Sequence, residues 1–85
     1  MSQESRNAAL NDVAKRIEEN AEAAEPLDVD GLTESLLSMR GEDPYYNRGV
    51  VEGIGVVHAN KDFIVTEAVA LAERVRDRTN IEQEF

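Results

Sequence analysis

The side chain best suited to acid-base chemistry is His58, the single histidine of this 85-residue chain. An imidazole titrates near neutral pH, so it can transfer a proton in catalysis or respond to pH. A catalytic histidine also needs a nucleophile beside it, and the hydroxyls of Ser35, Ser38 and Thr66 are scattered, with no glycine-flanked serine among them. A histidine on the surface or at a helix end is the favoured interpretation, and we expect no enzyme activity.

Two short segments begin like ligand-binding loops but lack the residues that complete such loops. Asp28-Val29-Asp30-Gly31 resembles the start of a calcium loop, yet Leu32 and Thr33 stand where that loop needs an oxygen ligand and a glycine. Residues 49–55 are rich in glycine but lack the third glycine of a dinucleotide fingerprint and the lysine of a P-loop. With no cysteine and one histidine, a zinc site is also excluded. We therefore expect no metal and no cofactor.

A group of contact-forming side chains follows the turn at Pro44. Tyrosine and arginine are enriched at binding hot spots, because each combines a large contact area with directional hydrogen bonds. Glycines four residues apart on a helix let another backbone approach closely. An aromatic residue also ends the tail at 81–85. The candidate partner-binding residues are Tyr45, Tyr46, Arg48, Gly49, Gly53 and Phe85. Under the alternative interpretation, one tyrosine anchors the core and the other is solvated.

The charge of the chain limits its partners. Asp and Glu number 18 against 9 Lys and Arg, which gives a net charge of -9. Such a chain repels phosphate polymers and anionic headgroups over about 10 Å at 0.1 M salt, so we expect no direct binding to nucleic acid or membranes. Many acids with few lysines are also typical of a protein from a high-salt cytoplasm, although an ordinary acidic protein is the alternative.

One acidic helix face offers a different function. Carboxylates at helical spacing could imitate a phosphate backbone and occupy the groove of a DNA- or RNA-handling protein, which would make the chain an acidic inhibitor. A solvated helix face is the simpler interpretation of such a charge run. The carboxylates concerned are Asp12, Glu18, Glu19, Glu22 and Glu25.

The apolar spacing predicts helices at both ends of the chain. In residues 1–25, an Ala- and Glu-rich segment, the apolar residues form one narrow stripe that suits close packing against another helix, and Pro26 ends the helix. A second stripe, near the C-terminal end of the chain, predicts the last helix. This stripe continues to Val75, and the helix is expected to end at Asn80. The two stripes consist of Leu10, Val13, Ala14, Ile17, Ala21 and Ala24, and of Ile64, Val65, Ala68, Leu71, Ala72 and Val75.

Residues 26–43 are expected to form a short helix and a linker. Asp28 is the predicted N-cap, and Gly41 would supply the left-handed residue with which many helices end. The apolar face of this helix consists of Val29, Leu32, Leu36 and Met39. Asp43-Pro44 then has the pattern of a cap followed by proline at the first helical position, so a new helix should begin there.

The segment that follows Pro44 fits two structures. As a helix it places Tyr46, Val50, Ile54 and Val57 on one face, with the glycine pair beside them. Alternatively, residues 50–66 could form a β-hairpin. Each glycine destabilises an isolated helix by roughly 1 kcal/mol, which favours this alternative. A lone hairpin is marginal in water and its turn lacks an Asn-Gly pair, so the helix is preferred.

These observations predict one small all-α domain over residues 1–85, a bundle or extended hairpin of three to four helices, with residues 44–80 as a helical hairpin; an α+β fold is the alternative. So short a chain builds a small core, which favours assembly. We expect an interaction protein, an accessory subunit of a larger assembly such as a virus particle, that binds a protein or its own copies. No signal peptide or membrane span is visible, which predicts a cytoplasmic or virion location.

Overall fold

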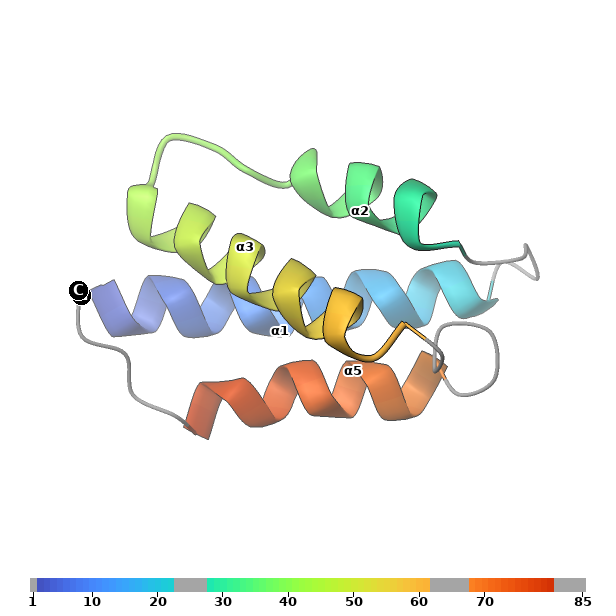
Figure 1. The fold of residues 1–85 in the computed structure, drawn as a ribbon. Helices are drawn as coiled ribbons and strands as arrows, with labels where there is room; N and C mark the ends of the chain where they lie inside the picture. Colours follow the sequence, from blue (N-terminus) through green and yellow to red (C-terminus); the bar gives the residue numbers. More distant parts are fainter. Residues whose placement is uncertain (1, 23–27, 62–67, 81–85) are drawn as a thin grey trace.

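The computed structural model describes residues 2–22, 28–61 and 68–80, and this part of the chain is helical with no strand. It contains four α-helices and a short 3-10 helix (Figure 1): α1 (Ser2–Glu22), α2 (Val29–Leu37), α3 (Pro44–Ala59), α5 (Ala68–Asp77) and η1 (Arg78–Asn80). The predicted all-α bundle is confirmed. The hairpin alternative is wrong, because its first strand falls within α3. The expected helix end at Pro26, the start of the last apolar stripe and the tail 81–85 lie outside the described residues.

The longest helix, α1, lies along the middle of the bundle, and α3 and α5 pack along it (Figure 1). Most of the described side chains that the spacing placed on apolar stripes are buried, and the core forms where the four helices meet. Fully or almost fully buried are Ala9, Leu10, Val13, Ala14, Ile17, Leu32, Leu36, Val50, Val57, Leu71, Ala72 and Val75. The narrow alanine-rich stripe of α1 therefore finds its helical neighbours within the same chain.

Two glycines set the distance between α3 and α1. A Cβ atom added to Gly49 would lie 2.5 Å from the backbone oxygen of Arg6 and 2.6 Å from the Cβ of Ala9. One added to Gly53 would lie 2.9 Å from Cγ1 of Val13. Both contacts are too short for any larger residue, so the glycines that disfavour an isolated helix are required by this crossing. This packing explains why α3 is a helix despite its glycine content.

The predicted caps of α2 and α3 are present. The carboxylate of Asp28 accepts a hydrogen bond from the backbone N–H of Gly31, and Oδ1 of Asp43 accepts from the backbone N–H of Tyr45 at 2.9 Å. Pro44 occupies the first turn of α3, where a missing N–H costs nothing. The sequence signals for these two helix starts were therefore correct.

The prediction for Gly41 was wrong. Helix α2 ends at Leu37, and its C-cap, Ser38, has the right-handed φ of -66°; Gly41 does not adopt a left-handed conformation. Its backbone instead exchanges two hydrogen bonds with the side chain of Asn47, which donates to the Gly41 oxygen at 2.8 Å and accepts from its N–H at 2.9 Å. The linker is thus held by a side-chain amide from α3, which removes the need for a glycine cap.

Replacing Asp28 with alanine is expected to lower the free energy of unfolding by about 1 kcal/mol, because the first turn of α2 loses its cap. Urea denaturation followed by circular dichroism measures the change. Asp28→Ser removes the same charge but keeps a capping oxygen, so it should retain most of the stability. Equal losses in the two variants would show that charge, rather than the cap, matters at this position.

Candidate functional site

The two adjacent tyrosines at the start of α3 have different surroundings. Tyr45 is 40% exposed. Tyr46 points inward, and its hydroxyl donates a hydrogen bond to Oδ2 of Asp12 at 2.7 Å. Burial, followed by this contact with a carboxylate, raises the pKa of Tyr46 to about 12. Tyr46 therefore joins α3 to α1, and Tyr45 remains at the surface. This arrangement agrees with the alternative interpretation of the sequence, in which one tyrosine packs against the core and the other is exposed.

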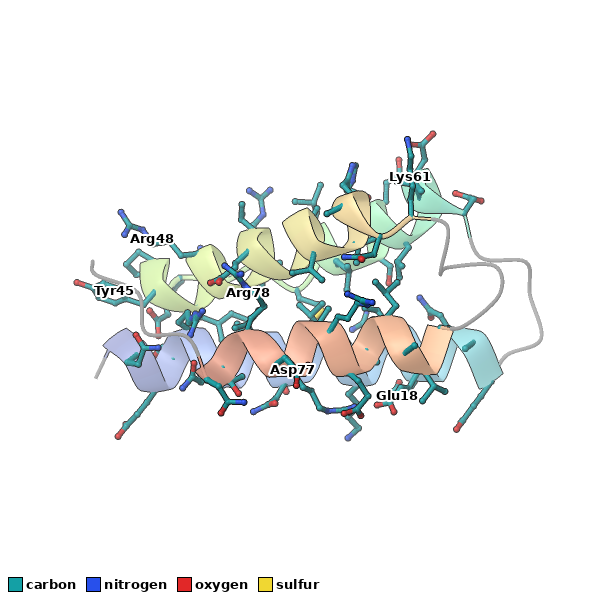
Figure 2. All side chains as sticks on the ribbon, turned by 60° about the horizontal axis from the view of Figure 1, so that its bottom comes forward. Glu18, Tyr45, Arg48, Lys61, Asp77 and Arg78 are labelled. Atoms are coloured by element: carbon teal, nitrogen blue, oxygen red, sulfur yellow. The ribbon has the colours of Figure 1, made fainter. Side chains whose placement is uncertain are left out.

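Two of the candidates, Tyr45 and Arg48, lie on the exposed side of α3. Tyr45 and Arg48 point away from the bundle at the same end of the molecule (Figure 2). Val51, one turn further along, is 54% exposed. A shallow pocket of about 330 Å³ lies here, lined by Arg40, Pro44, Asn47, Arg48 and Val51. We define the outer face of α3 as its exposed residues Tyr45, Arg48, Val51, Gly55, His58 and Ala59.

The structure places the other candidates elsewhere. Gly49 and Gly53 are buried against α1, so the backbone that they admit belongs to the same chain, whereas we expected another subunit to contact them. Phe85 lies outside the described residues. Of the six predicted partner-binding residues, Tyr45 and Arg48 are the ones that this structure places on an exposed surface.

A buried ion pair that the sequence did not reveal lies behind the outer face. Arg6 of α1 is completely buried, and its guanidinium donates from Nε to Oε2 of Glu52 at 2.8 Å and from Nη2 to Oε1 at 2.7 Å. Arg78 of η1 donates to the same Oε1 from Nε at 3.0 Å. Glu52 thus connects α1, α3 and η1. Bidentate geometry of this kind is among the strongest forms of charge-assisted hydrogen bond.

The signal for this network was weak in the sequence. Glu52 is the one carboxylate of α3 and lies within its glycine-rich, apolar segment 49–57, where a charge indicates a buried partner. Nothing local, however, distinguishes Arg6 from the other basic residues of the chain. The pairing depends on the α1–α3 crossing, which joins residues 46 positions apart.

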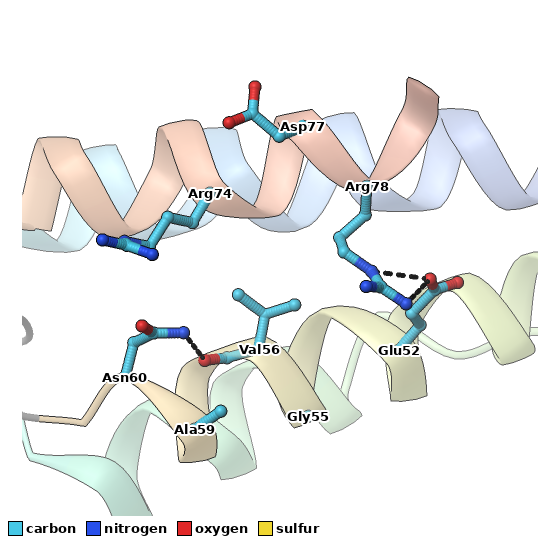
Figure 3. A pocket seen from close by; sticks show the side chains of 8 residues that line it. All are labelled: Glu52, Gly55, Val56, Ala59, Asn60, Arg74, Asp77 and Arg78. Atoms are coloured by element: carbon cyan, nitrogen blue, oxygen red, sulfur yellow. Dashed lines mark hydrogen bonds and ion pairs between the residues drawn. The ribbon is translucent and has the colours of Figure 1, made fainter. Parts of the chain in front are cut away.

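A groove separates α3 from α5 on the side of this network (Figure 3). Its volume is about 590 Å³, and Glu52 and Arg78 meet across it. In the middle of the wall formed by α3 stand Gly55, Val56 and Ala59, with Glu52 and Asn60 at its two ends. The lining residues are Glu52, Gly55, Val56, Ala59, Asn60, Arg74, Asp77 and Arg78. These include no serine, threonine, cysteine or histidine, and of the two carboxylates in the lining, Glu52 is held by the guanidinium groups of Arg6 and Arg78.

His58 has a structural contact. Its Nε2 lies 2.9 Å from the hydroxyl of Thr33, which joins the C-terminal half of α3 to α2. This pair lies on an exposed surface, and the hydrogen-bond partner of the imidazole here is a hydroxyl, whereas a catalytic histidine is usually oriented by a carboxylate. Within residues 2–22, 28–61 and 68–80, no three His, Cys, Asp or Glu side chains gather as metal ligands. The geometry is that of a contact between two helices.

Two of the carboxylates proposed as a phosphate-like face are engaged inside the chain. Glu18 pairs with the guanidinium of Arg76 on α5, and this hydrogen bond lowers the pKa of Glu18 despite the opposing effect of desolvation. Asp12 accepts the hydroxyl of Tyr46. Glu19 and Glu22 are exposed, and Glu25 lies outside the described residues. The acidic face therefore has fewer carboxylates available to a partner than the sequence indicated.

The ion-pair network predicts a pH dependence of stability. Burial raises the pKa of Glu52, but the hydrogen bonds from Arg6 and Arg78 outweigh it and leave that pKa below the ordinary value of 4.5. Because the folded pKa is the lower one, the stabilisation is complete above pH 4.5 and is lost as the pH falls through the folded value.

This pH dependence of stability can be measured by urea denaturation at a series of pH values from about 6 down to about 3, a range that spans the titration of a carboxylate. In Glu52→Gln the loss of stability on acidification should be smaller than in the wild type, because the titrating group is gone. Glu19→Gln, at an exposed position on α1, should leave the wild-type slope unchanged. Identical slopes in all three proteins would contradict the prediction.

Comparison with known proteins gives no family for this chain: it matches no family model, no curated protein and no solved structure. Among the described residues, none of the helices combines the length and the apolar character that crossing a membrane requires.

Proposed function

We propose that this chain is a non-enzymatic interaction protein, a small accessory subunit of a larger protein assembly, and that it binds through the outer face of α3. The observation that carries this proposal is the position of its exposed apolar side chains. In the described part of the chain three large hydrophobic residues are exposed, and two of them, Tyr45 and Val51, lie on this face beside Arg48. This combination of an aromatic, an aliphatic and a guanidinium side chain is typical of binding hot spots.

The internal packing supports a surface role for these residues. The buried side chains form one continuous core, and no buried side-chain nitrogen or oxygen in the described residues lacks a hydrogen-bond partner. Tyr46 and Val50 contribute to the fold from the opposite side of α3. Tyr45 is 40% exposed and Val51 is 54% exposed, so another protein can contact both on the outer face of α3.

Small size and net charge fit an accessory subunit. The chain has room for one domain and carries a net charge of -9, which disfavours nucleic acid as its direct ligand. A virus particle is one assembly of the kind we propose. The alternative, an acidic mimic of nucleic acid, has less support, because Asp12 and Glu18 are engaged within the chain.

Site-specific photo-crosslinking tests this function. A photo-reactive amino acid is placed at Tyr45 and, as a matched control, at Val69, the exposed apolar residue of α5 that is 63% exposed. In cells of the source organism, the probe at position 45 should give a discrete adduct with another protein, and the probe at 69 should not. No adduct at 45, or the same adducts at both positions, would contradict the proposal. An adduct with a nucleic-acid-handling protein from a probe at Glu22 would favour the mimic instead.

A further inference from the structure

Of the four described helices, α2 buries the fewest residues. It lies at the edge of the bundle, whereas α1, α3 and α5 pack along one another (Figure 1). Two of its nine residues, Leu32 and Leu36, are buried, and Val29 adds a partly buried side chain. A helix of nine residues is too short to be stable by itself in water. The structure of α2 therefore depends on this small apolar contact.

The polar contacts of α2 are hydrogen bonds that water can replace. Nη1 of Arg16 on α1 donates to Oγ of Ser35 at 3.0 Å, and the hydroxyl of Thr33 meets Nε2 of His58 at the surface. Exchanging such bonds for bonds to water changes the free energy little. By contrast, the carboxylate of Glu52 joins α1, α3 and η1, and a second ion pair joins α1 to α5. We call α1, α3, α5 and η1 the three-helix frame, because these ion pairs hold it together without α2.

Charge opposes the docking of α2. Asp28, Asp30 and Glu34 are exposed, residues 28–37 contain no basic side chain, and the whole chain has a net charge of -9. In the part of the chain that the structure describes, no ion pair neutralises these three carboxylates. Repulsion between like charges destabilises a compact state, and salt shortens its range from about 10 Å at 0.1 M to about 3 Å at 1 M. Low salt should therefore loosen α2, and high salt should hold it in place.

We propose that α2 is a lid: it leaves the three-helix frame as a unit while the frame stays folded, and high salt holds it closed. Local opening of this kind occurs where few buried apolar contacts hold an element in place. The open state uncovers Leu32, Leu36 and the part of the core beneath them, an apolar surface that the closed molecule hides. This inference goes beyond the proposed function and does not rest on it, because the lid opens in the chain alone.

Amide hydrogen exchange of the wild-type chain, followed by NMR, tests the lid. The amides of residues 33–37 in α2 should have protection factors at least about tenfold lower than those of Val13 and Val50 in the frame. A low concentration of urea should leave exchange in α2 nearly unchanged, because the opening exposes little surface, and should accelerate exchange in the frame. Raising the salt from about 0.1 to about 1 M should slow exchange in α2 more than in the frame. Equal protection in α2 and the frame would overturn the inference, and an equal response of both to salt would overturn the role of charge.

Thiol labelling provides a second readout, since the natural chain contains no cysteine. Leu36→Cys and Leu71→Cys are matched variants, because both leucines are completely buried, one in α2 and the other in α5 of the frame. Circular dichroism checks that both variants fold. A thiol reagent should modify position 36 at least about tenfold faster than position 71, since the lid opens more often than the frame unfolds. Equal labelling rates at the two positions would overturn the inference.

Discussion

Arg6→Met is expected to lower the free energy of unfolding by about 3 kcal/mol, because it leaves the carboxylate of Glu52 without its bidentate partner. Arg6 is fully buried and donates two hydrogen bonds to that carboxylate. The expected loss lies at the lower end of the range for breaking a buried ion pair. The side chain of Glu52 is 17% exposed to solvent, and Arg78 stays in contact with it after the substitution. Urea denaturation at neutral pH measures the effect.

Two further variants separate the ion pair from a general loss of arginine. Arg16→Met removes a partly exposed arginine that bonds Ser35 on α2, and it should cost less than about 1 kcal/mol. Adding Glu52→Leu to Arg6→Met removes both buried charges and should recover part of the stability. A cost for Arg6→Met no larger than that for Arg16→Met would show that the buried pair is not an important contact.

Gly49→Ala is the second substitution with a large expected effect. The new methyl group would lie 2.5 Å from a backbone oxygen of α1, and a backbone atom cannot move aside as a side-chain end can. The two helices would have to separate, at a cost of about 1–3 kcal/mol or more. Gly53→Ala meets the side chain of Val13 and should destabilise by a smaller amount.

The matched control lies on the opposite side of the same helix. Gly55→Ala places a methyl group in open space, so it should raise the free energy of unfolding of the monomer by about 0.5–1 kcal/mol. The two alanine substitutions, six residues apart in α3, should thus differ in sign when urea denaturation is measured at low protein concentration. A change of the same sign in both would contradict the α1–α3 packing.

The all-α class and a bundle of three to four helices could be predicted from the sequence, because the segments have apolar stripes at helical spacing and two of them have strong caps. The spacing also identified the buried residues of α5, where Leu71, Ala72 and Val75 face the core. Whether residues 50–61 form helix or strand could not be decided locally. Glycine is unfavourable in both structures. The helix is favoured because Gly49 and Gly53 pack against α1, which is 40 residues away along the chain.

The candidate surface was only partly predictable, for a similar reason. Tyr45 and Arg48 are exposed as a binding site requires. Composition alone could not show that Tyr46 bonds Asp12 or that the glycine pair faces α1, since both depend on how the helices cross. The third glycine of α3, Gly55, was considered only as part of the glycine-rich segment 49–55. Its open surroundings, which single it out from Gly49 and Gly53, are a property of the tertiary structure.

The most direct test of the proposed role of α3 is a pair of ¹⁵N NMR spectra of the wild-type chain, one of the chain alone and one with the protein that the probe at position 45 captures. If the outer face of α3 is where this chain binds its partner, the shifts that the added protein causes should concentrate at Arg48, Val51, Gly55 and Ala59, while α5 around Val69 stays unchanged. Shifts centred on α1 or α5, or spectra that do not change when the protein is added, would contradict this account.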